Sequence, residues 1–191
     1  MRNRSAAVIS SAKFLLLVIW LTAFSSISSA QDYQAQLDAG TDPKNISTLF
    51  GNLSFLASFA MGAAWVLTGP WLRDAHDRIS ATHPGQIRQG RAWAVWGWIV
   101  PVVSLWFPRQ MIGDMLKDKR VDDEGDAIPL NSWWLSWIAF ALLSNVQSAM
   151  EITNTTIHNP IRPTFEIAGA CLLTAAYMVW IRIVKAIDAA S

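Results

Sequence analysis

The sequence has little charge and almost no cysteine, and both absences exclude whole classes of protein. Only 15% of its 191 residues are Asp, Glu, Lys or Arg, against roughly 25% in ordinary soluble domains. The single cysteine, Cys171, excludes an internal disulfide and a cysteine-rich metal site. The net charge of +1 excludes the clustered basic excess that nucleic-acid binding requires, so no nucleic-acid partner is expected.

What the sequence does contain is long apolar runs, and their lengths indicate a membrane protein. The stretches 14–31, 46–72 and 127–150 carry no charged residue and are 18, 27 and 24 residues long. A helix needs about 20 residues, rising 1.5 Å each, to cross a bilayer. We therefore predict an all-α integral membrane protein, with the lipid bilayer as its first partner.

We expect a single membrane domain over residues 1–191 with four transmembrane helices and two charged loops. The expected helices cover about 14–30, 47–71, 132–150 and 164–181, and the charged loops cover 73–91 and 109–131.

The first 30 residues have two interpretations. Arg2, Arg4 and Lys13 precede an apolar core that ends in small residues at Ala30, as in a cleaved secretory signal peptide. The apolar stretch is longer than the 7–15 residues or so of a signal core. For this reason, and because of the resemblance described below, we favour a retained first helix and keep cleavage as the alternative.

Residues 92–108 decide the topology, since they are apolar and rich in tryptophan but interrupted by Pro101 and end at Pro108. If they cross the bilayer, 8 of the 15 Lys and Arg residues lie inside and 7 outside; if they re-enter, the division is 13 to 2. Basic loops are retained in the cytoplasm. We therefore expect a re-entrant segment in a cell-membrane protein whose N- and C-termini are cytoplasmic. A full crossing, giving five spans, is the alternative, and it distributes the tryptophans more evenly between the two interfaces.

The geometry of the segment also favours re-entry. Nine helical residues from Ala92 to Val100 rise about 14 Å, or roughly half of the hydrocarbon thickness. Pro101 has no backbone N–H and clashes with a preceding helical turn, so it suits the apex of a hairpin.

The same segment carries a sequence motif, which continues into the third long apolar stretch. The motif residues are Arg91, Trp93, Trp96, Gly97, Trp98, Pro101, Leu105, Trp106, Pro108, Asp114, Trp133 and Trp134. This pattern resembles the bacterial membrane-protein family catalogued as domain of unknown function 4328. The resemblance covers most of the chain and implies a multi-pass topology, but no particular activity. Ser104 and Arg109 depart from it, since the family tends to have Asn and an aromatic residue there.

The sequence shows no pattern for catalysis, a cofactor or a metal. His76 and His83 are seven residues apart and lie in a stretch expected to be a solvated loop, without the spacing of metal ligands. His158 stands alone. No serine lies in a Gly-x-Ser-x-Gly elbow, and no Gly-rich phosphate loop is present. We expect neither an enzyme nor a cofactor.

Two features of the spans could serve function or structure. Glu166 is an acid one turn inside the last span, where an intramembrane carboxylate suggests a functional site. Its position near a helix N-terminus, four residues from Arg162, also favours a structural role. Ser54, Ser58 and Gly62 are four residues apart, a spacing that allows helix packing or self-association in lipid.

The leading hypothesis is a non-catalytic scaffold, or a subunit that binds lipid, a protein partner or a second copy of itself. The basic residues Arg109, Lys117, Lys119 and Arg120 could hold anionic lipid headgroups. The acidic residues interleaved between positions 114 and 126 would offset much of that attraction, so we favour a solvated loop that fixes the orientation of the protein. The alternative is a small-solute or ion pathway that uses the re-entrant segment and Glu166.

Overall fold

The computed structural model describes residues 2–100, 102–117, 127–153 and 159–190, and in these residues the regular structure is helical. The elements are α1 (Arg2–Asp38), η1 (Pro43–Asn45), α2 (Leu49–Thr82), α3 (Trp93–Trp96), η2 (Val103–Leu105), α4 (Phe107–Met115), α5 (Leu130–Thr153) and α6 (Pro163–Ala190). The all-α prediction is confirmed.

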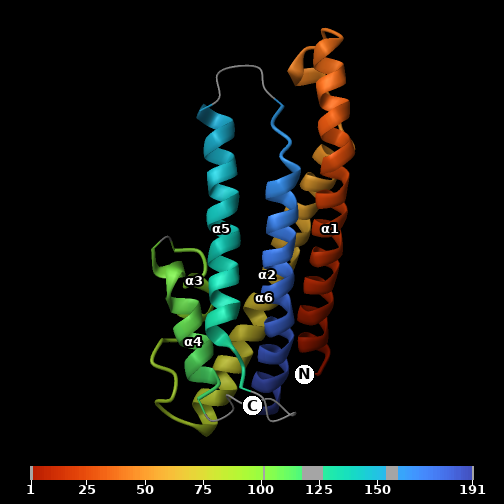
Figure 1. Cartoon of the computed structure of the whole chain (residues 1–191). Coiled ribbons are helices and arrows are strands. Elements are labelled where there is room, and N and C mark those ends of the chain that lie inside the picture. Colours follow the sequence, from red (N-terminus) through yellow and green to blue (C-terminus); the bar gives the residue numbers. More distant parts are fainter. Residues whose placement is uncertain (1, 101, 118–126, 154–158, 191) are drawn as a thin grey trace.

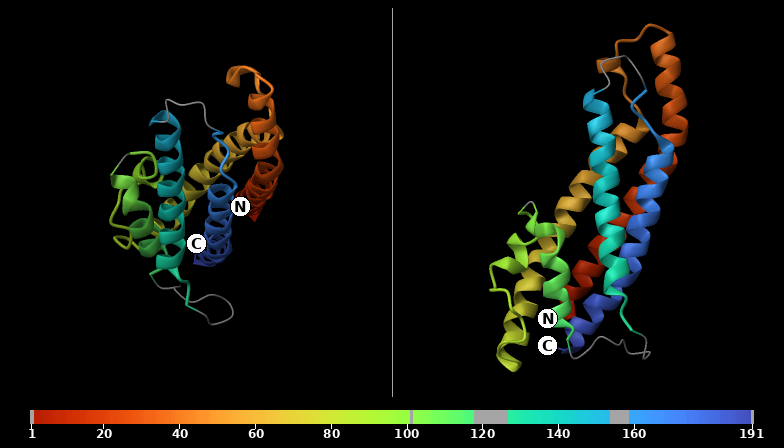
Figure 2. Two further views of the ribbon diagram at one scale, coloured as in Figure 1. Left: turned by 45° about the horizontal axis from the view of Figure 1, so that its top comes forward. Right: turned by 60° about the vertical axis from the view of Figure 1, so that its left-hand side comes forward.

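The four long helices form an elongated bundle with both chain ends at the same end (Figure 1). Helix α1 packs against α2 and α6, and α5 packs against α6, whereas α2 and α5 scarcely touch each other. The short helices α3 and α4 lie against α2 and α5, beside the half of the bundle that holds the chain ends (Figure 2). The segment between α2 and α5 therefore folds back on itself.

Three of the described helices are long and apolar enough to cross a membrane. They are α1 over Arg4–Asp38, α2 over Leu49–Thr82 and α6 over Pro163–Ala189. Large apolar side chains are exposed on each, among them Phe24, Phe59 and Met178, all at least 61% exposed. Such surfaces are unusual on a monomeric soluble protein, so they indicate a membrane protein with its apolar faces toward lipid.

The structure corrects the expected charged loop at 73–91, because α2 continues through it to Thr82. Leu72, Ala75 and Ile79 fall on one side of the helix and are buried, so an amphipathic face carries the helix beyond the apolar run. His76 lies on the same turns and is also buried, which corrects the expectation of a solvated loop around it.

The expected loop at 109–131 is corrected in the same way, since α4 occupies its first part. Pro108 lies in the first turn of α4, where its missing N–H has no helical partner to lose. Met111, Ile112 and Met115 then form a buried face. Lys119, Arg120 and His158 lie outside the described residues.

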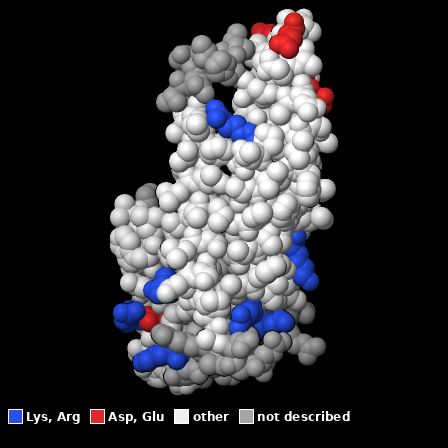
Figure 3. Space-filling model, in the orientation of Figure 1, with Lys and Arg blue, Asp and Glu red and all other residues white. Residues whose placement is uncertain are grey.

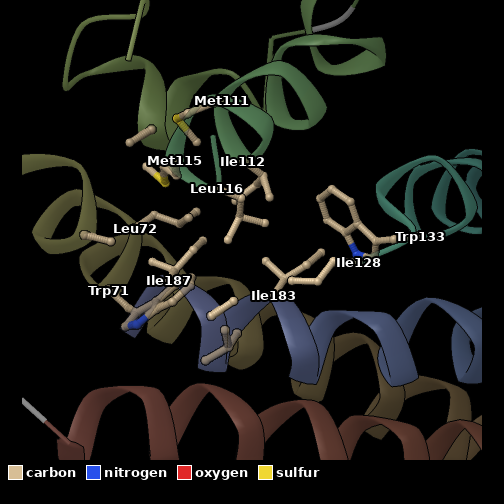
Figure 4. Packing of buried hydrophobic residues seen from close by; sticks show 14 of the residues in the cluster. Trp71, Leu72, Met111, Ile112, Met115, Leu116, Ile128, Trp133, Ile183 and Ile187 are labelled. Atoms are coloured by element: carbon tan, nitrogen blue, oxygen red, sulfur yellow. The ribbon is translucent and has the colours of Figure 1, made fainter. Parts of the chain in front are cut away.

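A cluster of fully buried apolar side chains lies at the end of the bundle where α2, α4 and α6 meet (Figure 4). Trp71 and Leu72 of α2, Ile112 of α4, and Ile183 and Ile187 of α6 are each at most 1% exposed. This core fixes α4, the second half of the folded-back segment, to the long helices.

Candidate functional site

The two ends of the folded-back segment, residues 83–117, are joined by a pair of charged side chains. The Arg88 guanidinium donates to both carboxylate oxygens of Asp114, at 3.0 and 3.1 Å. Gln86 adds a hydrogen bond from its side-chain amide to the carbonyl of Asp114, at 2.9 Å. The hydrogen bond and charge of Asp114 raise the pKa of the Arg88 guanidinium above its ordinary value. We call residues 91–117 the hairpin.

Further polar contacts attach the start of the hairpin to α2. Arg91 donates to the Asp77 carboxylate at 2.9 Å. The buried His76 ring donates through Nε2 to the carbonyl of Gln89, also at 2.9 Å, since a carbonyl only accepts. The motif residues Arg91 and Asp114 therefore hold the base of the hairpin in place.

Gly97 packs closely against its own helical turn, and the opposite arm of the hairpin lies at ordinary contact distance. A Cβ atom at this position would lie 2.8 Å from the carbonyl oxygen of Trp93 and 3.5 Å from the Phe107 side chain. The rings of Trp93 and Phe107 meet across the same gap, with centroids 5.1 Å apart. The motif glycine is thus explained by close packing.

The far end of the hairpin turns sharply beside α5. Val102 has φ 67°, a left-handed conformation that is strained for a β-branched residue. The carbonyl of Leu105 accepts a hydrogen bond from the indole N–H of Trp134, at 2.9 Å. This bond satisfies a backbone group in the irregular part of the segment. Pro101, the expected apex, lies outside the described residues.

The motif tryptophans divide into a packed set and an exposed set. Trp98 of the hairpin meets Trp133, Trp134 and Trp180, with ring centroids 6.1 to 6.4 Å apart. Trp133 also stacks on Trp180 at 5.6 Å. By contrast, the other motif tryptophans are between 38% and 52% exposed. These are Trp93, Trp96 and Trp106. Trp180 lies outside the motif, and its direct contacts with Trp98 and Trp133 could not be read from the sequence.

Glu166 lies far from the hairpin. Its carboxylate accepts a hydrogen bond from the side-chain amide of Gln147, at 2.8 Å. Trp180, which contacts the hairpin, is 14 residues further along α6, a rise of about 21 Å. The structure therefore does not bring Glu166 and the hairpin together in one site.

The small residues of α2 do not pack against another helix of the chain at Ser58 and Gly62. Both are exposed, and a Cβ atom at Gly62 would have no atom within 4 Å. The half-buried Ser54 and the buried Ala57 and Ala60 lie on turns nearby. Self-association through the exposed part stays a prediction.

Among the hollows formed by the described residues are two of nearly equal size, and both are open to the surface. The first, the tryptophan cavity, has a volume of about 430 Å³ and lies between α1, α2, α3, α5 and α6. Its aromatic lining residues are Trp65, Trp98, Trp133, Trp137, Tyr177 and Trp180. The sequence does not predict this cavity, because the cavity exists only where α2 and α5 do not pack against each other.

The second hollow, the arginine groove, has a volume of about 440 Å³ and lies where α4 meets the start of α5. Arg88, Asp114, Arg109 and Asn131 line it. The exposed Arg109 guanidinium donates through Nε to the neutral side chain of Asn131 at 2.9 Å. Within the described part of the chain, Arg109 has no carboxylate at ion-pair distance. In the same residues, no group of three His, Cys, Asp or Glu is placed to hold a metal ion.

Comparison with known proteins gives one result. No curated protein and no solved structure matches the chain. The family described as "Domain of unknown function (DUF4328)" matches residues 44–189. The match begins just before α2, includes the whole hairpin, and ends within the last turn of α6. The chain belongs to the DUF4328 family.

Proposed function

We propose that the protein is a four-span membrane protein in which the hairpin re-enters the bilayer from the cytoplasmic side, with both termini cytoplasmic. The distribution of charge supports this orientation. All described Lys and Arg residues except Lys44 and Arg162 lie in the half of the bundle that holds the chain ends. On the face shown in Figure 3, basic groups gather toward that end and acidic groups toward the opposite tip. Basic segments are retained in the cytoplasm.

Helices α1 and α5 belong among the four spans in this proposal. Helix α1 is linked to its neighbours by hydrogen bonds from Trp20 to Thr174 at 3.0 Å and from the Phe50 backbone N–H to Ser29 at 3.2 Å. Helix α5 has 24 residues and is about 36 Å long. It lies along α6, and its three tryptophans suit an interfacial end.

We further propose that the protein is a non-catalytic subunit that binds anionic phospholipid at its cytoplasmic face. The observation that carries this proposal is the arginine groove. It contains two arginines and one carboxylate, Asp114, which is already bound by Arg88. Within the described residues, the remaining cation, Arg109, donates through Nε and one NH₂ group to Asn131 only, and a guanidinium matches the geometry of a phosphate group. In the proposed orientation the groove lies near the level of lipid headgroups.

Substitution of Arg109 tests this proposal. The purified protein would be exposed to nanodiscs or micelles that contain phosphatidylglycerol or phosphatidylcholine, and the bound lipid would be counted by native mass spectrometry. A basic residue near a membrane surface contributes about 1 kcal/mol to the binding of anionic lipid. Arg109→Gln should therefore reduce the binding of phosphatidylglycerol about fivefold, without changing that of phosphatidylcholine.

Lys44→Gln is the matched control, since it removes an equally exposed cation from the opposite end of the bundle. It should leave phosphatidylglycerol binding unchanged. Equal effects of the two substitutions would refute a specific role for the groove.

The pathway hypothesis gains no support from the geometry. It requires Glu166 and the hairpin to line one passage, and the α6 residue that contacts Trp98 of the hairpin, Trp180, lies about 21 Å along the helix from Glu166. The Glu166 carboxylate is bound by Gln147, and neither hollow includes it in its lining.

A further inference from the structure

The tryptophan cavity is a second site with a different chemistry from the arginine groove. We propose that it holds one acyl chain of a bilayer phospholipid. The inference rests on the membrane insertion proposed above, but not on the binding of anionic headgroups.

The lining of the cavity excludes a charged ligand. None of its lining residues is Asp, Glu, Lys, Arg or His. Thr68 supplies one of its two hydroxyl groups, and that hydroxyl already donates to the carbonyl of Ala64 at 2.7 Å. The other belongs to Tyr177, and its oxygen is buried without a hydrogen-bond partner among the described residues, as is the indole nitrogen of Trp98. Most of the lining is aliphatic and aromatic carbon, so the surroundings suit hydrocarbon.

The size of the cavity requires an occupant. Its volume of about 430 Å³ is nearly three times the roughly 150 Å³ of an engineered apolar cavity that stays dry and binds benzene. Unfilled apolar space destabilises a protein in proportion to its volume. A cavity this large, with flat indole walls, has room for a segment of a flexible chain.

The cavity is open to the outside at the depth of the hydrocarbon. Gly62 and Trp65 of α2 line it and are also exposed on the surface of the molecule. Both lie near the middle of Leu49–Thr82, a helix apolar and long enough to cross the membrane. Among the described elements, α2 and α5 scarcely touch each other, so these two helices do not close the cavity against each other. At this depth the molecules that surround the protein are acyl chains.

Photo-crosslinking in a bilayer tests the proposal. The full-length protein would be reconstituted into phosphatidylcholine nanodiscs that contain a phosphatidylcholine with a diazirine in the middle of one acyl chain. Light releases N₂, and the carbene that remains inserts into a nearby C–H or O–H bond. Peptide mass spectrometry should locate adducts on the cavity walls, at Trp137 and Tyr177. Adducts are also expected on the lipid-facing residues Phe55 and Leu142, which are 68% and 60% exposed.

A cavity-filling variant and its control sharpen the test. Gly62→Phe places a ring where a Cβ atom meets nothing within 4 Å, and it should reduce the adducts at Trp137 and Tyr177 at least fivefold. Ala63→Phe adds the same ring to the neighbouring exposed residue, which does not line the cavity, and it should leave them unchanged. Neither variant should alter the adducts at Phe55 and Leu142.

The outcomes separate the two proposals. Wild-type adducts at Phe55 and Leu142 but none at Trp137 and Tyr177 would overturn the acyl-chain site, and so would cavity adducts that Gly62→Phe does not reduce. If Gly62→Phe fails to fold, the wild-type pattern alone decides. The absence of adducts at all four positions would instead contradict membrane insertion and remove the basis of both proposals.

Discussion

Substitution of Gly97 by alanine tests how the hairpin is built. The added Cβ atom would lie 2.8 Å from the carbonyl oxygen of Trp93, so the backbone must move. Such overpacking costs about 1–3 kcal/mol. A gain of about 0.4–1 kcal/mol from the reduced freedom of the unfolded chain offsets part of this cost. The net expectation is a hairpin that opens more readily by about 1.4 kcal/mol, or tenfold.

Hydrogen–deuterium exchange measures this opening locally. The amides of Gly97, Trp98 and Ile99 donate to backbone carbonyls within the hairpin, at 3.0 to 3.2 Å. In Gly97→Ala these amides should exchange about tenfold faster, while those in the middle of α6 keep their rates. A local measurement is preferable to thermal unfolding, which is frequently irreversible and then reports a rate.

Gly113→Ala is the matched control, because the same chemical change meets an open site. Gly113 lies in α4, and a Cβ atom there would be 3.9 Å from Leu130 of α5, an ordinary contact. This variant should slow exchange in α4, since alanine is the better helix former. Equal exchange in Gly97→Ala and the wild type, or faster exchange in both variants, would refute the close-packing explanation.

Two further predictions concern the polar pairs. Asp114→Arg should open the base of the hairpin, as measured by the distance between spin labels at residues 90 and 117. Adding Arg88→Asp restores a pair of opposite charges and should close the base again. A double variant that is as open as the single variant would show that the pair does not hold the base. Glu166→Gln should unfold near the wild-type temperature in detergent, because Gln147 keeps an acceptor. In Glu166→Leu the free energy of unfolding should fall by about 1–3 kcal/mol, because the Gln147 side-chain amide loses its acceptor. Equal melting temperatures for the two variants would show that Glu166 does not stabilise the protein through this bond.

The sequence was sufficient for the helical class, the apolar cores of the helices and the family. Charge-free apolar runs of about 20 residues or more usually form helices that face lipid. The family motif identified the hairpin, because Pro101 interrupts the apolar run and cannot continue a helix. The depth of the hairpin in the bilayer stays a prediction.

The remaining features depend on contacts that single-sequence patterns do not specify. Arg73 and Asp74 suggested a loop, although the buried spacing of Leu72, Ala75 and Ile79 was present in the sequence and extends α2 to Thr82. The stacking of Trp180 on Trp133 joins residues 47 positions apart, and the tryptophan cavity requires knowing which helices fail to meet.

Cysteine labelling on both sides of the hairpin tests the central claim most directly. Single cysteines would replace the exposed residues Gly90, Lys117 and Lys44, each in a chain whose native Cys171 is changed to serine. Intact cells would be treated with a membrane-impermeant maleimide. Re-entry predicts labelling at position 44 only, with positions 90 and 117 both protected until the membrane is opened. Labelling at 117 but not at 90 would show that the hairpin crosses the bilayer and would contradict the proposed topology.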